Sequence, residues 1–221
     1  MATVLITGAN RGIGLEYCRQ LQARGDRVVA VCRRPSAELE ALGVRIEADV
    51  DVTREDAVEQ LVDALDGLPI DLLIHNAGLL ERTTLTDLNP ESIRRQFEVN
   101  ALAPLRLTAA LLPQLSAGSR LVLMTSRMGS IGDNSSGDSY GYRMSKVALC
   151  MAGKSLSIDL KPRGIAVAIL HPGLVSTAMT GFTSVGISPE QAVRGLLARI
   201  DGLTLENSGT FWHANGEVLP W

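Results

Sequence analysis

The fold of this chain is decided by one stretch near its start, Thr3-Val4-Leu5-Ile6-Thr7-Gly8-Ala9-Asn10-Arg11-Gly12-Ile13-Gly14. Residues 3–7 form a short apolar, β-branched run, which is typical of a buried parallel strand. Leu15, Cys18 and Leu21 then recur at helical spacing. The glycines therefore lie in a turn between a strand and a helix. The free N–H groups at the start of that helix, and the positive end of its dipole, favour a bound phosphate.

Each glycine of this turn has its own predicted role. Gly8 adopts backbone angles that a side chain forbids, Gly12 lets the backbone approach a pyrophosphate, and Gly14 lets the helix pack closely against its strand. The predicted contacts to a dinucleotide in this turn are Gly8, Asn10, Arg11, Gly12, Ile13 and Gly14. The alternative is a purely structural turn, because tight turns often carry glycine.

Composition narrows the class of protein. The chain has 221 residues, enough for one large α/β domain with a substantial core. Its net charge is −3, which argues against a nucleic-acid-binding protein that relies on a basic surface. The three cysteines (Cys18, Cys32 and Cys150) lack metal-ligand spacing, so we expect buried reduced thiols and no metal site.

The apolar segments also bear on location. The first strand begins within a few residues of Met1, which leaves no room for a signal or transit peptide. No apolar run is long enough to span a bilayer. We therefore expect a cytoplasmic protein that does not enter the membrane.

The rest of the chain alternates strands and helices. Further strands are predicted at residues 26–32, 44–48, 70–74, 120–125, 165–170 and 210–213, with helices following Thr53, at 90–115, from Tyr142, and at 189–200. This pattern predicts a single α/β domain over residues 1–221: a doubly wound, mainly parallel seven-stranded sheet with helices on both faces. Residues 176–188 are polar and contain glycine, so we expect a mobile lid there.

Positive charge follows the second strand. Arg33 and Arg34 lie where dinucleotide folds meet the adenosine ribose, and no acidic residue accompanies them. Guanidinium groups suit a 2′-phosphate, and Arg11 adds a third, so we favour NADP(H) over NAD(H). The alternative is that both arginines are solvated turn residues. After the third strand, Asp51 and Val52 are the predicted adenine contacts, with Asp49 as the rival.

A tyrosine and a lysine carry the predicted chemistry. Tyr142 and Lys146 are four residues apart, which places them on one face of a helix. A nearby ammonium favours the phenolate, so Lys146 is expected to lower the pKa of Tyr142. Tyr140 is an alternative phenol but lacks a cation at this spacing. The strand at 120–125 delivers Ser126 at its carboxyl end, where open α/β sheets bind ligands.

Taken together, these motifs resemble the classical short-chain dehydrogenase/reductases. The matching positions, in the family's order, are Thr7-Gly8-xxx-Gly12-x-Gly14, Asn76-Ala77-Gly78, Asn100, Ser126, Tyr142-xxx-Lys146 and Pro172-Gly173-Leu174-Val175-Ser176-Thr177. The similarity covers essentially the whole chain. The extended loop before Tyr142, the His171-Pro172-Gly173 turn and the ending at Trp221 are most similar to the compact C-factor and sniffer-type carbonyl reductases.

The resemblance implies a Rossmann-type fold and a set of roles. Tyr142 would exchange the substrate proton, Ser126 would hydrogen-bond the reacting oxygen, and Asn100 would hold a water in a proton relay behind Lys146. Lys146 would also bind the nicotinamide ribose. Further cofactor contacts are expected at Asn76, Ala77, Gly78, Pro172, Gly173, Val175 and Thr177, beside Tyr142 and Lys146 themselves.

The family pattern is broken at two places. His75 replaces the first asparagine of the usual Asn-Asn-Ala-Gly, and we expect it to support the turn. The separation between Ser126 and Tyr142 is longer than usual, so Ser130 is the second candidate for the substrate-facing serine.

The predicted function is NADP(H)-dependent interconversion of a small-molecule carbonyl and alcohol. The alternative is a cofactor-binding regulatory or signalling protein with incidental turnover. The family also implies a homodimer or homotetramer, and the apolar face of the helix after Tyr142 is a candidate subunit interface. The alternative is that this face belongs to the core.

Overall fold

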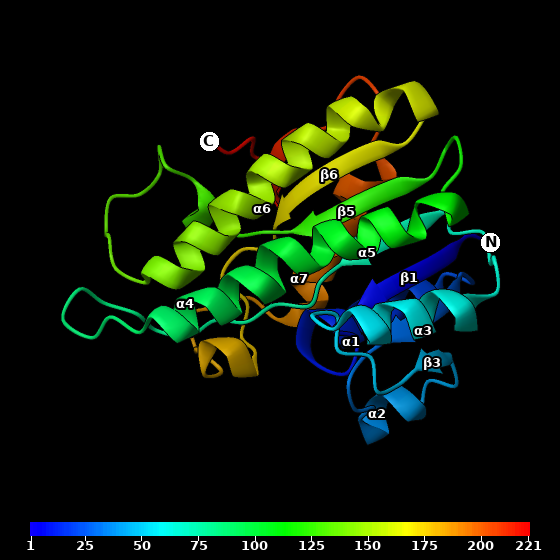
Figure 1. Cartoon of the computed structure of the whole chain (residues 1–221), viewed down its shortest axis with the longest axis horizontal. Helices are drawn as coiled ribbons and strands as arrows, with labels where there is room; N and C mark the ends of the chain where they lie inside the picture. The colour runs from blue at the N-terminus through cyan, green and yellow to red at the C-terminus, as the bar shows by residue number, and fades with distance from the viewer.

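A seven-stranded sheet forms the centre of the computed structural model, which describes residues 1–221 (Figure 1). The strands run in the order β3-β2-β1-β4-β5-β6-β7, and every neighbouring pair is parallel. Their bounds are β1 Thr3–Thr7, β2 Arg27–Val31, β3 Arg45–Glu47, β4 Leu72–His75, β5 Arg120–Met124, β6 Ala166–His171 and β7 Phe211–His213. This confirms the predicted doubly wound α/β fold, with the order reversing between β1 and β4.

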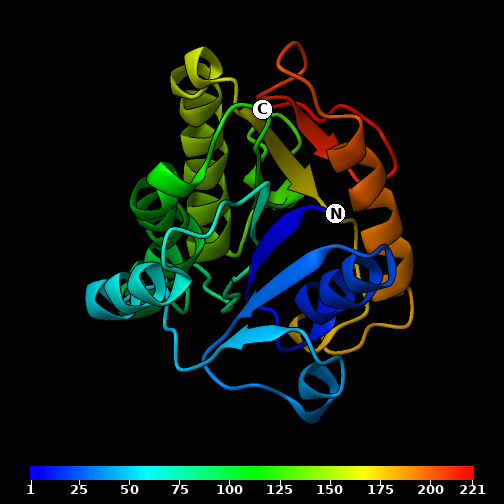
Figure 2. The ribbon, with the colours of Figure 1, turned by 90° about the vertical axis from the view of Figure 1, so that its right-hand side faces the viewer.

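Helices cover both faces of this sheet. Their bounds are α1 Gly12–Ala23, α2 Ala37–Glu40, α3 Glu55–Leu65, α4 Pro90–Phe97, α5 Ala103–Leu111, α6 Tyr140–Asp159 and α7 Pro189–Asp201. Figure 2 shows α1 and α7 on one side of the sheet, with α3, α5 and α6 on the other. None of these helices combines the length and apolar character needed to cross a lipid bilayer.

Side-chain alternation along the strands divides the core in two. Ile6, Ala30 and Leu170 belong to the cluster under α1 and α7. Leu5 and Val29, their neighbours in sequence, belong to the cluster under α3, α5 and α6. A central parallel sheet is buried on both faces, which is why its strands read as continuous apolar runs rather than alternating ones.

The helix predicted at 90–115 is interrupted. It consists of α4, a π-helical turn at Glu98–Leu102, α5 and a short final turn at Leu112–Gln114. Pro104 has no N–H to donate to the carbonyl of Asn100. The Ala103 N–H bonds to the Glu98 carbonyl, five residues back, which is the pattern of a π-helical turn. The sequence does not predict this π-helical turn, because the spacing of apolar residues does not reveal one residue added to a single turn of helix.

The starts of two other helices refine the prediction. The cap of α3 is expected at Thr53 or a neighbour, and its neighbour Arg54 occupies that position, without a side-chain hydrogen bond. The Thr53 hydroxyl donates to Asp51 instead. The helix expected from Tyr142 begins at Tyr140, where main-chain bonding to Thr83 starts it earlier.

Candidate active site

The glycine turn between β1 and α1 has no room for a side chain at Gly8 or Gly14. Gly8 and Gly12 have φ values of 66° and 54°, in the left-handed region that favours glycine. A Cβ on Gly14 would lie 2.6 Å from Asn76 Nδ2 and closer still to the Gly8 carbonyl. The start of α1 has no side-chain cap, so its first N–H groups are available to a phosphate. The turn therefore fits the pyrophosphate of a dinucleotide.

Residues at the end of β4 hold this turn in shape. Thr7 Oγ1 accepts hydrogen bonds from the main-chain N–H groups of Asn76 and Ala77, both at 3.1 Å. The Asn76 side chain donates to the carbonyls of Thr7 and Gly8, at 3.1 and 3.2 Å. Asn76 thus shapes the turn, and Ala77 packs directly against Gly8.

The next region lies beyond β2 and β3. Arg33 and Arg34 are exposed, and neither forms an ion pair with a carboxylate. Burial raises the pKa of Asp51, but hydrogen bonds from Thr53 and the charge of Arg33 outweigh it, so the pKa lies below its usual value.

The candidate adenine contacts differ in their surroundings: Asp51 and Val52 are half-buried, whereas Asp49 is exposed. Val52 lines a small hollow at the ends of β1 and β4, together with Thr7, Ala77 and Val99. Asp49 is exposed in the connection after β3, with φ of 60°, and its main chain bonds to Arg33.

Tyr142 and Ser126 lie together at the carboxyl ends of the central strands. Both are buried. Burial raises the pKa of Tyr142 to about 12, and the nearby Ser126 hydroxyl partly opposes that rise. Ser126 Oγ also accepts the N–H of Met128 at 3.1 Å, which fixes its rotamer. Of the two serines considered, Ser126 is therefore the one paired with the tyrosine.

Lys146 lies beneath the tyrosine ring. Its Nζ is 5.6 Å from the ring centroid and donates to the Met124 carbonyl at 2.8 Å. Burial lowers the pKa of Lys146 to about 8. The sequence predicts that this ammonium lowers the pKa of Tyr142, but the structure shows the opposite net direction. Desolvation of the phenolate dominates here, and it was not readable from the spacing.

Asn100 sits within the π turn and is fully buried. Its Oδ1 accepts the Leu79 N–H at 2.8 Å, and its Nδ2 donates to the Leu79 carbonyl at 2.8 Å and to Ser145 Oγ at 2.9 Å. Ser145 Oγ in turn donates to the Tyr142 carbonyl at 2.8 Å. The sequence analysis missed Ser145, although its place between Tyr142 and Lys146 was a usable signal.

Gly78 brings these groups to one point. A Cβ at Gly78 would stand 3.4 Å from Asn100 Oδ1 and 3.8 Å from Lys146 Nζ. The predicted positions 78, 100 and 146 therefore lie side by side, and Lys146 connects them to the ring of Tyr142.

The loop after β6 reaches the glycine turn. The Thr177 methyl group lies 3.4 Å from where a Cβ on Gly12 would stand. Gly173, next to Pro172, has φ of 88°. The ends of the loop are joined by hydrogen bonds from Ser176 N–H to the Ile187 carbonyl and from Ile187 N–H to the Leu174 carbonyl, both 2.9 Å. Thr180 Oγ1 donates to the Val175 carbonyl at 2.6 Å, so the predicted lid is a loop closed on itself.

The remaining candidates lie apart from this space. Ser130 Oγ accepts the Asp133 N–H at 3.0 Å and stabilises its own loop. Tyr140 only begins α6. His75 bonds through Nε2 to Thr108 Oγ1 at 2.8 Å, and burial lowers its pKa to about 3, as suits a neutral supporting residue. His213 packs edge-on against His171, with ring centroids 4.9 Å apart. The three cysteines are buried and unpaired, as predicted.

Comparison with known proteins places this geometry in context. The family model for short chain dehydrogenase matches residues 2–185. A 1-hydroxy-2-glutathionyl-2-methyl-3-butene dehydrogenase from Rhodococcus sp. (strain AD45) is 44% identical over 227 residues, covering 100% of both chains. The C-signal protein of Myxococcus xanthus is 46% identical over 156 residues, covering 69% of this chain and 93% of the relative.

Solved structures agree with this match over the whole chain. The carbonyl reductase Sniffer of D. melanogaster superposes with a TM-score of 0.91 at 29% identity, covering 100% of each chain. An NADPH-bound carbonyl reductase from chicken fatty liver superposes with a TM-score of 0.89 at 30% identity, covering 100% of this chain and 99% of that one. The resemblance to sniffer-type reductases is thereby confirmed.

Proposed function

The chain belongs to the short chain dehydrogenase family, and on that premise we propose that it interconverts a carbonyl and an alcohol with NADP(H). The observation that carries this proposal is the convergence of Tyr142, Ser126, Lys146 and Asn100 beside the glycine turn. The cofactor, when bound, supplies or accepts the hydride. The chain's own residues bind, orient and exchange the proton.

In the proposed reaction Tyr142 is the acid and base. With its pKa raised by burial, the phenol stays protonated at neutral pH and holds a proton ready for the carbonyl oxygen. Ser126 contacts the same oxygen and fixes its position. In the alcohol direction the phenol must first lose its proton, so that direction gains from higher pH.

Lys146 and Asn100 hold Tyr142 and its surroundings in place. Lys146 holds its ammonium near the tyrosine ring and, as implied by the family, offers hydrogen bonds to the nicotinamide ribose. Asn100 fixes the chain at Leu79 and, through Ser145, the first turn of α6 that carries Tyr142. We propose that Asn100 also completes the proton relay behind Lys146.

The preference for NADP(H) rests on Arg33 and Arg34. Both guanidinium groups are exposed and free of carboxylate partners, and the adjacent turn carries the exposed Arg11. A 2′-phosphate would give them charge-assisted, bidentate partners. A similar solved carbonyl reductase is described as NADPH-bound.

The substrate side favours an uncharged, apolar carbonyl compound. Leu174, Phe182 and Val185 of the loop after β6 are 51, 71 and 81% exposed. Arginines in the loops after β4 and β5 are already occupied: Arg82 pairs with Asp138, and Arg127 pairs with Glu217. The related Rhodococcus enzyme is named for a glutathionyl compound, so glutathione conjugates are included in the test below.

The test is initial-rate oxidation of NADPH and of NADH over a panel of quinones, aldehydes, ketones and glutathione conjugates. We expect turnover with NADPH, and a loss of about 10²–10⁴-fold in Tyr142→Phe, because the general acid is removed. Tyr140→Phe is the matched control and should retain its activity. Turnover that survives in Tyr142→Phe would contradict the assignment.

The second candidate is a regulatory or signalling role that needs the bound cofactor but not turnover. The similarity to C-signal of Myxococcus xanthus favours it. The same variant separates the two roles. A biological effect that persists in Tyr142→Phe, with cofactor binding intact, would support signalling over catalysis.

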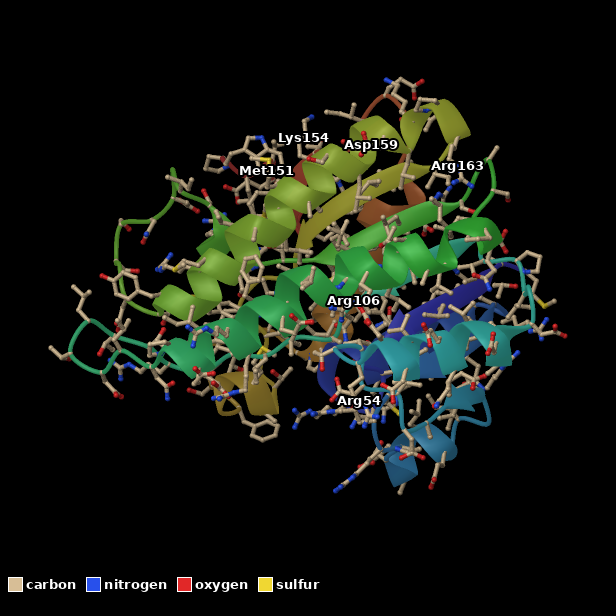
Figure 3. The ribbon with its side chains drawn as sticks, in the orientation of Figure 1. Arg54, Arg106, Met151, Lys154, Asp159 and Arg163 are labelled. Atoms are coloured by element: carbon tan, nitrogen blue, oxygen red, sulfur yellow. The ribbon has the colours of Figure 1, made fainter.

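We propose that the protein pairs with a second copy through the outer layer of α4, α5 and α6. Met144, Met151 and Ile158 recur at seven-residue spacing on α6 and are 53, 68 and 62% exposed. Figure 3 labels Met151 on this helix. Light scattering should show a homodimer or homotetramer that dissociates in Met151→Glu. A wild-type monomer at all concentrations would contradict the proposal.

A further inference from the structure

An arginine that lies outside the predicted site connects two segments of that site. Arg106 lies on α5 and is absent from the family motifs described above. Its side chain is only 24% exposed and reaches toward the start of α3. Figure 3 shows Arg106 between α5 and α3, above Arg54. Its partners come from two segments to which the proposed function assigns separate tasks.

The first partner lies in the loop between β3 and α3. Arg106 Nη1 donates to the Thr53 carbonyl at 2.9 Å, and no main-chain N–H donates to that carbonyl. Thr53 also donates its N–H and its hydroxyl to Asp51, at 3.0 and 2.7 Å. The position of Asp51 and Val52 therefore depends on a residue whose carbonyl is held by Arg106.

This loop has little support from its own helix. Arg54, at the cap position of α3, makes no capping hydrogen bond and pairs with Asp56 instead. Local bonds close the loop on itself, from Thr53 and the Arg54 N–H to Asp51, but they do not attach it to α5. The contact from Arg106 supplies that long-range attachment.

The second partner is the π turn. Arg106 Nη2 donates to Glu98 Oε1 at 3.0 Å, and Glu98 is the first residue of the turn that holds Asn100. Glu55, at the start of α3, lies 4.0 Å from Arg106 Nε and adds a second carboxylate. One planar guanidinium thus joins the loop of the predicted adenine contacts to the turn of the predicted proton relay.

We infer that Arg106 is a positioning residue that sets the adenosine-binding loop and the Asn100 turn relative to each other. The inference rests on the proposed function, since it takes Asp51, Val52 and Asn100 in their proposed roles. It assigns Arg106 no contact with cofactor or substrate. Its effect on cofactor affinity comes through Thr53, and its effect on turnover comes through Glu98.

The test uses binding and rate together, on the full chain. Titrations with NADPH and with adenosine 2′,5′-bisphosphate report the adenosine half without catalysis. We expect Arg106→Met to weaken both by about tenfold, which is the effect of losing a hydrogen bond to a charged group. Arg106→Lys should fall between, because an ammonium does not span both partners.

Glu98→Ala tests the other half of the link. It leaves the bond from Arg106 to Thr53 in place, so affinity for adenosine 2′,5′-bisphosphate should stay within about twofold of the wild-type value, while kcat at saturating NADPH falls by about threefold to tenfold. A Glu98→Ala variant with wild-type kcat would overturn the link to the Asn100 turn.

Arg163→Met is the matched control. Arg163 also donates to a carbonyl of a neighbouring helical segment, that of Leu112 at 3.1 Å, but at the far end of α5 (Figure 3). The Arg163→Met substitution should lower the melting temperature without changing the dissociation constant for NADPH or for adenosine 2′,5′-bisphosphate. If it weakens nucleotide binding as much as Arg106→Met does, the effect is general stability and the inference fails.

The failures of the two ideas are distinguishable. A wild-type protein that binds neither NADPH nor adenosine 2′,5′-bisphosphate overturns the proposed function, and the inference falls with it. A wild-type protein that binds both, with an Arg106→Met variant that binds them equally well, overturns the inference alone.

Discussion

Gly14, in the turn after β1, is enclosed by Gly8 and Asn76, whereas Gly181, in the loop after β6, has open space where a Cβ would stand. The two segments approach each other at Gly12 and Thr177, yet they differ in construction. The first is held by hydrogen bonds from a neighbouring strand end. The second is tied mainly to itself and exposes apolar side chains. This contrast fits the proposed division of labour, in which the glycine turn binds the cofactor with strict geometry and the loop after β6 contacts the substrate through adjustable side chains.

The largest expected effect tests the glycine turn after β1, the rigid segment of this comparison. Gly14→Ala forces a carbon against the Gly8 carbonyl, so we expect a loss of about 1–3 kcal/mol in unfolding free energy and of about tenfold to a hundredfold in NADPH affinity. Chemical denaturation and cofactor titration measure these. Gly181→Ala is the control in the loop after β6, and only its left-handed backbone should add a cost, about 1 kcal/mol. Equal losses in both variants would remove the contrast.

Charge at the end of β2 gives the next effect. Replacing both Arg33 and Arg34 by Ala should lower the preference for NADPH over NADH by about tenfold to a hundredfold, because two guanidinium partners of the 2′-phosphate are lost. The ratio of kcat/KM for the two cofactors measures it. Arg27→Ala, at the opposite end of the same strand, should leave the ratio unchanged. An unchanged ratio in the double variant would return both arginines to the role of solvated turn residues.

A smaller effect is expected in the loop after β6, the adjustable segment of this comparison. Phe182 has φ of 54° and is 71% exposed. Phe182→Gly relieves the left-handed strain of about 1 kcal/mol and removes an apolar ring from the loop. KM for bulky apolar carbonyls should rise severalfold, while KM for NADPH and the melting temperature change little. A rise in KM for NADPH instead would show that this loop belongs to the rigid segment.

The smallest effect at neutral pH concerns His75, beneath the rigid turn. Its folded pKa of about 3 lies below the ordinary value of 6.5, so the unfolded chain binds the proton more readily between these values. Stability therefore falls as pH drops through that window, by at most about 1.4 kcal/mol per pH unit. His75→Asn should flatten this loss in urea unfolding at pH 7 and pH 5. The same acid sensitivity in the variant would assign it to other groups.

Much of the site was predictable because its signals are local. The glycine turn is one short motif, and Asn76 and Ser126 each directly follow a recognisable strand. Tyr142 and Lys146 are only four residues apart. Regular geometry turns such spacing into position: a parallel strand delivers its last residue to the same edge as its neighbours, and four residues of helix return to one face.

By itself the sequence determined the order of strands and helices along the chain and the members of the proposed catalytic group. Only the tertiary structure decided what each member experiences. Desolvation made the Tyr142 pKa rise rather than fall, and the π turn aimed Asn100 at Leu79 and Ser145. It also brought Ser126, rather than Ser130, close to Tyr142, and it brought Arg106 to Thr53, 53 positions away in sequence. The physical reason is that burial and long-range hydrogen bonds depend on how distant segments pack, and no local pattern of residue types records that packing.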